Sequence, residues 1–94
     1  MANNWQNSLW NMLMRQRLIK YISTTIRYYR KSKELSQEEL AHFSGLDRTY
    51  ISGVERGVRN ITIDSLEQII EALEVPQEIF FEKIIKEMKD DIHN

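Results

Sequence analysis

Apolar residues recur every three or four positions through most of this 94-residue chain. Because 3.6 residues complete one helical turn, this spacing predicts amphipathic helices. We expect five helices, over about residues 17–33, 36–45, 47–56, 62–74 and 76–92. The apolar stripe of the first helix consists of Ile19, Ile22, Ile26 and Tyr29. The last helix has a wider stripe, made of Ile79, Phe80, Phe81, Ile84, Ile85, Met88 and Ile92.

Polar residues predict where several of these helices begin and end. Ser36 and Glu39 have the spacing of a capping box, in which each side chain accepts a hydrogen bond from the backbone of the other residue. Asp47 and Thr62 are of the types that cap helix N-termini, and Gly57 follows the third helix as a C-terminal glycine does. With 3 glycines and 1 proline, the chain has few residues for the turns of a sheet. An all-α fold follows.

The first sixteen residues fit this scheme less directly. Trp5, Leu9 and Met12 follow a helical rhythm that Gln16 interrupts. This segment extends the first helix, forms a separate helix or remains mobile. We therefore divide the chain into an N-terminal extension, residues 1–16, and one domain, residues 17–94, since a chain of this length suffices for a single compact domain.

Composition narrows the class of protein. The chain has no cysteine and only two histidines, His42 and His93, so we expect no disulfide, no metal site and no cofactor. No apolar run approaches the roughly 20 residues that span a bilayer, and the charges of the amino terminus follow its apolar part, the reverse of a secretory signal. We expect a cytoplasmic protein with no membrane partner and no small-molecule ligand.

Charge is distributed unevenly along the chain, although the net charge is only −1. Residues 1–33 contain seven Lys or Arg and no acidic residue, whereas residues 61–94 contain nine acidic and three basic residues. Cations gathered toward the end of the first helix suit the carboxyl terminus of a helix dipole. One half of the molecule is therefore suited to a polyanion and the other is not.

The stretch QEELAHFSGLDRTYISGVER, residues 37–56, has the spacing of a DNA-binding helix-turn-helix. Such a motif needs a small residue where two helices approach, a turn residue that adopts positive φ, and apolar residues that fix the second helix. Those positions are filled by Ala41, Gly45, Leu46, Ile51 and Val54. An ordinary helical hairpin with a glycine turn is the alternative interpretation.

The second helix of this motif would present polar side chains to DNA. Arg48, Thr49 and Ser52 lie on the side opposite Ile51 and Val54. Arginine can bind guanine O6 and N7 bidentately, and a threonine methyl can meet the methyl group of thymine. The N-terminus of the preceding helix, where the positive end of the dipole attracts a phosphate, begins at residue 37.

Residues 35–76, LSQEELAHFSGLDRTYISGVERGVRNITIDSLEQIIEALEVP, resemble the Cro/cI-type (XRE) helix-turn-helix domain, and the resemblance covers about residues 19–82. Within that family, the run LDRTYIS-x-x-ER-x-x-RN-x-T is similar to the controller proteins of restriction-modification systems. The resemblance implies a five-helix, lambda repressor-like protein that binds inverted-repeat operators as a homodimer. It further implies control of its own gene and of a restriction endonuclease gene in a bacterium, at the nucleoid, with RNA polymerase as a further partner.

The resemblance also implies roles for individual residues. Arg48, Thr49 and Arg59 would read bases, and Tyr50 would contact DNA near the centre of the operator. The phosphate contacts implied by the resemblance belong to Gln37, Ser52, Arg56 and Asn60.

Two residues of the same pattern have a structural role in this family. Arg30, at the end of the first helix, and Glu55, at the end of the third, match a partly buried ion pair that holds these helices together. Removing one partner of a buried pair typically costs roughly 3–5 kcal/mol, so Arg30→Ala is expected to abolish binding by unfolding the domain.

A dimer interface is expected on the last helix. One helix-turn-helix reads only a few base pairs, which is too little to select one site among at least about a million in a genome. The last helix has more apolar residues than one short helix can bury in so small a domain. The candidates are Phe80, Phe81, Ile84 and Ile85.

Other functions remain open from the sequence. A phage-type repressor would have the same DNA-binding fold. An antitoxin would have it too, and the amino-terminal segment would then hold the toxin. A pure protein-interaction module would have its contact surface on the last helix or around Trp5 and Trp10. An enzyme is disfavoured, because we find no nucleophile paired with a base and the acids after residue 60 are spaced like solvated helix faces.

Overall fold

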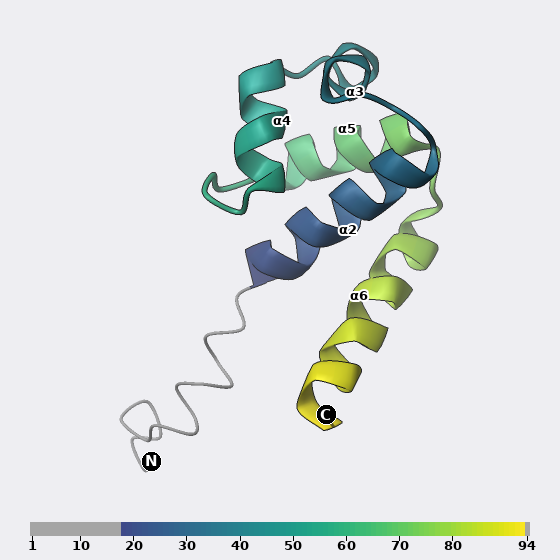
Figure 1. Ribbon diagram of the computed structural model, residues 1–94. Helices are drawn as coiled ribbons and strands as arrows, with labels where there is room; N and C mark the ends of the chain where they lie inside the picture. The colour runs from purple at the N-terminus through teal and green to yellow at the C-terminus, as the bar shows by residue number, and fades with distance from the viewer. Residues whose placement is uncertain (1–17, 94) are drawn as a thin grey trace.

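The computed structural model describes residues 18–93, so the expected N-terminal extension lies outside the described residues. Within residues 18–93 the chain forms five helices and no strand, which confirms the predicted all-α fold (Figure 1). The helices are α2 (Leu18–Ser32), α3 (Gln37–Ser44), α4 (Arg48–Glu55), α5 (Ile63–Leu73) and α6 (Gln77–His93). None of these five helices is long and apolar enough to cross a membrane.

One hydrophobic core joins the five helices. α2 contacts α4, α5 and α6, while α3 packs against both α4 and α5 (Figure 1). The side chains buried deepest between them come from the apolar stripes of the sequence, and include Ile26, Leu40, Ile51, Val54, Ile69, Leu73 and Phe80. Because α3 and α4 each pack on two other helices, the core fixes the direction of α4 relative to the rest of the domain.

The ends of α3 follow the predicted caps. The Glu39 backbone N–H donates to Ser36 Oγ at 3.0 Å, and the Ser36 backbone N–H donates to Glu39 Oε1 at 2.9 Å. At the other end, Gly45 has a φ of 75°, which is the left-handed region that glycine adopts readily. Asp47 occupies the N-cap position of α4 as expected, but its side chain makes no capping hydrogen bond.

The apolar residues of α6 divide into two groups, which narrows the predicted dimer interface. Phe80 and Ile84 are 0% and 3% exposed and belong to the core of a single chain. Phe81 and Ile85, one position further round the helix, are 40% and 50% exposed. The sequence pattern identified an apolar arc wider than the strip that α6 buries, so only the outer two of these four residues are available to a second copy.

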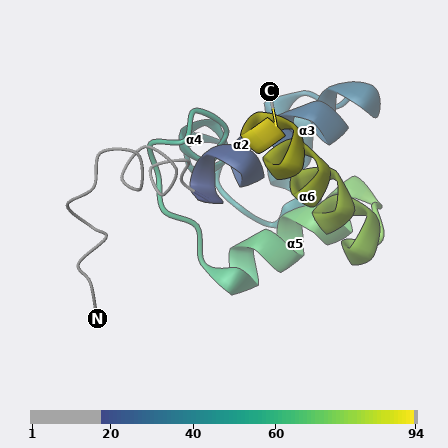
Figure 2. The ribbon, with the colours of Figure 1, turned by 90° about the horizontal axis from the view of Figure 1, so that it is seen from below.

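The charged residues separate in space as they do along the chain. α2 contains Lys20, Arg27, Arg30 and Lys31 and no acidic residue, whereas α6 contains five acidic and three lysine residues. Figures 1 and 2 place α4 and α6 on different sides of α2. The acidic helix therefore lies away from the helix that would meet DNA.

Candidate nucleic-acid interface

The outer face of α4 is polar and accessible. Arg48 and Thr49 are exposed and Ser52 is partly exposed. The opposite face carries Ile51 and Val54, which are buried. Since positions three and four apart share a helix face, the buried pair locks the rotation of α4 and thereby fixes where the polar side chains point.

A buried carboxylate lies at the junction of α2, α3 and α4. Arg30 Nε donates to Glu55 Oε2 at 2.6 Å and Arg30 Nη2 donates to Glu55 Oε1 at 2.9 Å, so the pair is bidentate. The Glu55 side chain is 0% exposed and that of Arg30 is 12% exposed. Arg27 Nε lies 3.9 Å from Glu55 Oε1, at the solvent side of the pair. Arg30 and Glu55 are the residues for which the sequence predicted this pair.

Gln37 takes part in the same network. It is the first residue of α3, and its Nε2 donates to Glu55 Oε1 at 3.1 Å. The side chain therefore turns toward the helix junction. A phosphate contact through the Gln37 side chain would require this hydrogen bond to break, whereas the free backbone N–H groups at the start of α3 need no such change.

The segment after α4 folds back onto that helix. Gly57 has a φ of 72°, and the Val58 backbone N–H donates to the Gly53 carbonyl at 3.1 Å. This turn brings Arg59 Cζ to 5.2 Å from the centre of the Tyr50 ring, a cation–π distance. The predicted DNA residues of α4 and of the following loop thus form one surface.

The remaining predicted residues lie at the end of α4. Arg56 is exposed and follows α4 directly, and its Nε donates to the Ser52 carbonyl at 3.4 Å. Asn60 is exposed, and its backbone carbonyl accepts a hydrogen bond from the Tyr50 hydroxyl at 3.4 Å. The Asn60 and Arg56 side chains are therefore accessible to a ligand that lies along α4.

Two residues in or beneath this surface were not among the candidates predicted from the sequence. Glu38 Oε1 lies 4.0 Å from Arg48 Nε, whereas the neighbouring Glu39 is used by the capping box. Gly53 lies buried in the middle of α4, under Arg59. A sequence signal existed for Gly53, because a glycine inside a helical pattern often marks the close approach of another segment.

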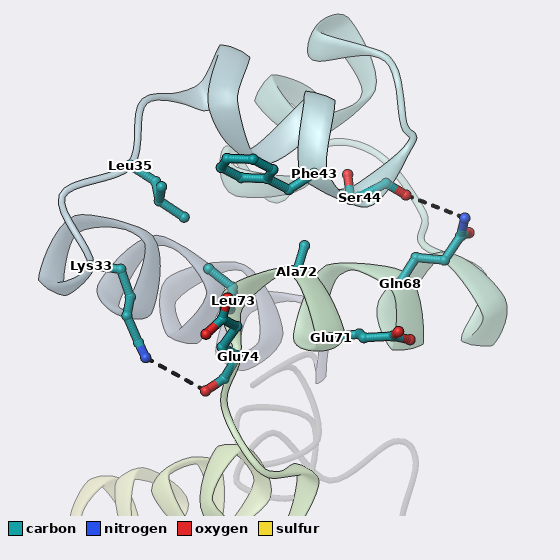
Figure 3. Close-up of a pocket in the computed structure, with 9 residues that line it drawn as sticks. All are labelled: Lys33, Leu35, Phe43, Ser44, Gln68, Glu71, Ala72, Leu73 and Glu74. Carbon is teal, nitrogen blue, oxygen red and sulfur yellow. Dashed lines mark hydrogen bonds between the residues drawn. The ribbon is translucent and has the colours of Figure 1, made fainter.

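One hollow among the described residues lies away from this surface. It is a groove of about 660 Å³ between α3 and α5, and none of the DNA candidates lines it. Figure 3 shows Phe43 and Leu35 above Ala72 and Leu73, with the Gln68 amide donating to the Ser44 carbonyl at 3.3 Å. This groove is distinct from the polar face of α4.

In helix-turn-helix proteins a short helix with a polar outer face is fixed against a second helix, and this places its side chains in the major groove. α3 and α4 have 8 residues each and are joined by the turn at residues 45–47. The fold and this surface define a DNA-binding protein of the helix-turn-helix class. The model of the helix-turn-helix family matches residues 26–78, and the chain belongs to that family.

The relatives of this chain include restriction-modification controller proteins. Control protein C.SmaI of Serratia marcescens is 48% identical over 52 residues, which cover 55% of this chain and 62% of that protein. Control protein C.BamHI of Bacillus amyloliquefaciens is 51% identical over 51 residues, which cover 53% of this chain and 63% of that protein. The chain thus spans about three fifths of the length of these two curated relatives.

A solved structure extends the similarity to the whole fold. The crystal structure of the restriction-modification controller protein C.Esp1396I matches with a TM-score of 0.74 and 52% sequence identity, over 76% of this chain and 93% of that one. C.Esp1396I has also been solved as a tetramer in complex with its natural 35 base-pair operator. The predicted resemblance to the controller group of the Cro/cI-type family is confirmed.

Proposed function

We propose that the protein is a sequence-specific DNA-binding transcriptional regulator that controls its own gene and a restriction endonuclease gene. The observation that supports this most directly is the fixed, polar face of α4 in a chain whose relatives are controller proteins. The basic residues of α2 and the end of α4 provide the positive potential that a phosphate backbone requires. The acidic α6 lies on another side of α2 and does not oppose the approach.

The residues divide by the kind of DNA contact that they suit. Arg48 is exposed at the start of α4, where its guanidinium can bind a guanine bidentately, and the adjacent Thr49 can meet a thymine methyl. Variants of C.Esp1396I have been solved with three consecutive residues, an arginine, a threonine and a tyrosine, replaced one at a time. The present chain has Arg48, Thr49 and Tyr50 in the same order. From the resemblance to the controller proteins we assign base reading to Arg48 and Thr49, and a contact near the operator centre to Tyr50.

The phosphate contacts would lie around the base-reading residues Arg48 and Thr49. Arg56 and Asn60 are exposed at and beyond the end of α4, and Ser52 is partly exposed between them and Arg48. Gln37 would contribute through the backbone N–H groups at the start of α3, since its side chain is bound to Glu55. These contacts fix the position of the protein on the duplex without selecting a sequence.

A homodimer on an inverted repeat completes the proposal. The two recognition helices would lie roughly 34 Å apart, one turn of B-DNA. Phe81 and Ile85 on α6 are the exposed apolar residues available for the two-fold contact. RNA polymerase is the expected further partner when the regulator activates a promoter.

A mobility-shift assay with the DNA upstream of its own gene tests the proposal. We expect a specific complex whose affinity falls about 10³–10⁵-fold between about 50 and 200 mM salt, because roughly 6–10 phosphate contacts release that many counterions. Arg48→Ala should lower the affinity for the operator by about 1–3 kcal/mol and relax the preference at one guanine. Lys86→Ala, on the exposed side of α6, is the matched control and should bind as the wild type does. No retardation at low salt would exclude the function.

A second experiment tests the dimer. Ile85→Glu places a charge on the proposed interface, and Ile92→Glu places the same charge on another exposed position of α6. Sedimentation should show that Ile85→Glu is monomeric while Ile92→Glu keeps the mass of the wild type. Equal behaviour of the two variants would place the interface elsewhere.

A further inference from the structure

Gly53 occupies a position where glycine lowers the stability of a helix. It lies in the middle of α4 and is buried, and glycine inside a helix is less favourable than alanine. A Cβ atom built on Gly53 would lie 3.1 Å from Arg59 Cβ and 3.4 Å from Arg59 Cδ. The aliphatic part of the Arg59 side chain therefore lies directly on the backbone of α4, and a residue larger than glycine would push Arg59 away from the helix.

The other end of the Arg59 side chain is also held by α4. The guanidinium lies over the ring of Tyr50, with Cζ 5.2 Å from the ring centre. The Tyr50 hydroxyl in turn donates to the carbonyl of Asn60, the residue after Arg59. Tyr50 thus contacts both the charged group and the backbone of the loop that carries it.

Tyr50 and Gly53 are three residues apart and lie on one side of the helix, next in sequence to Thr49 and Ser52. Arg59 therefore crosses α4 beside the polar face, although it belongs to a loop. A free arginine loses more rotamer freedom than most side chains when a ligand fixes it, so an arginine already held in place binds more tightly.

We propose that Gly53 and Tyr50 are positioning residues that hold Arg59 on the recognition helix, ready to meet a base edge. The inference rests on the proposed DNA-binding function and assigns Gly53 a role in specificity. The recognition surface is then a helix together with one loop arginine packed across it. Contacts with α4 orient the Arg59 side chain, and the positive φ of Gly57 turns the loop back toward the helix.

Gly53→Ala tests this role, because its effects on stability and on DNA binding should differ in sign. Alanine is the better helix former, so the melting temperature should stay equal or rise. The affinity for the operator should fall about 10-fold, since Arg59 is displaced and must be ordered on binding. The affinity for random DNA should change little, because the charge of Arg59 is retained.

The double variant provides the control. In the Arg59→Ala background, Gly53→Ala should cause no further loss of operator affinity, which a double-mutant cycle measures. Additive losses, or a ratio of operator to random-DNA affinity that Gly53→Ala leaves unchanged, would overturn the inference. Failure of the wild type to select the operator would instead refute the proposed function.

A measurement without DNA tests the geometry by itself. In NMR spectra of the free wild-type protein, the ring current of Tyr50 should shift the side-chain proton signals of Arg59, and Tyr50→Leu should remove the shift. Tyr50→Phe should retain it, because the ring remains. Unshifted Arg59 signals in the wild type would show that the arginine is not held on α4.

Discussion

Replacing Arg30 by alanine should destabilise the domain far more than replacing Arg27, although both arginines lie on α2 and both approach the same carboxylate. Arg30 makes two hydrogen bonds to Glu55, of 2.6 and 2.9 Å, and its side chain is nearly buried. Arg27 lies 3.9 Å away and its side chain is 48% exposed. The two variants remove the same charge from the same helix, so their difference measures the burial of Arg30 together with the direct hydrogen bonds that it makes.

The magnitude follows from what Arg30→Ala leaves behind. Glu55 would remain fully buried, with the Gln37 amide as its principal hydrogen-bond donor. An uncompensated buried charge of this kind costs about 3–5 kcal/mol. For a domain of this size, 1 kcal/mol lowers the melting temperature by roughly 4–8 °C, which predicts a fall of about 12–40 °C. Arg27→Ala should cost at most about 1 kcal/mol, as exposed pairs do.

Urea denaturation followed by far-UV circular dichroism measures both variants on the same scale. Glu55→Gln adds a third comparison and should cost less than Arg30→Ala. The Arg30 side chain retains some contact with solvent, and its Nη1 still donates to the Leu35 carbonyl at 2.8 Å. A difference of less than about 1 kcal/mol between Arg30→Ala and Arg27→Ala would show that the buried, hydrogen-bonded position of Arg30 does not determine how much it stabilises the domain.

Three other predictions concern separate sites. Thr25 Oγ1 is buried with no hydrogen-bond partner among the described residues, so Thr25→Val should raise the free energy of unfolding by about 1 kcal/mol in urea, and a loss would contradict this. Glu38→Gln removes a negative charge near the phosphates, so it should raise the affinity for random DNA about two- to five-fold in mobility-shift titrations. It should also lower the preference for the operator, because Arg48 loses its partner. If neither value changes, this prediction is wrong. The hydrogen bond to Asp91 and then burial raise the pKa of Tyr21, so its contribution to stability should be present below about pH 10 and lost as the pH rises through the folded-state value. Asp91→Asn should weaken that dependence in thermal melts at alkaline pH.

The helices and their caps were predictable because each has a local cause. The capping box of Ser36 and Glu39, the left-handed Gly45 and the side-chain cap of Thr62 are all present. In the predicted stripe of α2, Ile22 and Ile26 are buried, while Ile19 and Tyr29 at its ends are half-buried. These features depend on residues within a few positions of each other. Sequence periodicity therefore sufficed to locate them.

The direction of single side chains was less predictable, because it depends on contacts between helices. The periodicity of α6 could not separate Phe80, which is buried on α2, from the exposed Phe81. Nothing local to Gln37 indicates that its amide would bind Glu55, which lies 18 residues further along the chain. The stacking of Arg59 on Tyr50 likewise requires both Gly53 and the turn at Gly57.

The separation of charge between α2 and α6 has a consequence for kinetics. A molecule with a basic side and an acidic side has a dipole moment, and the field of a duplex turns such a molecule before the two touch. Most encounters would then begin with α4 toward the DNA, so the acidic helix contributes to the rate of productive collision without contacting the ligand. A protein with almost no net charge can in this way be attracted to DNA through its basic side.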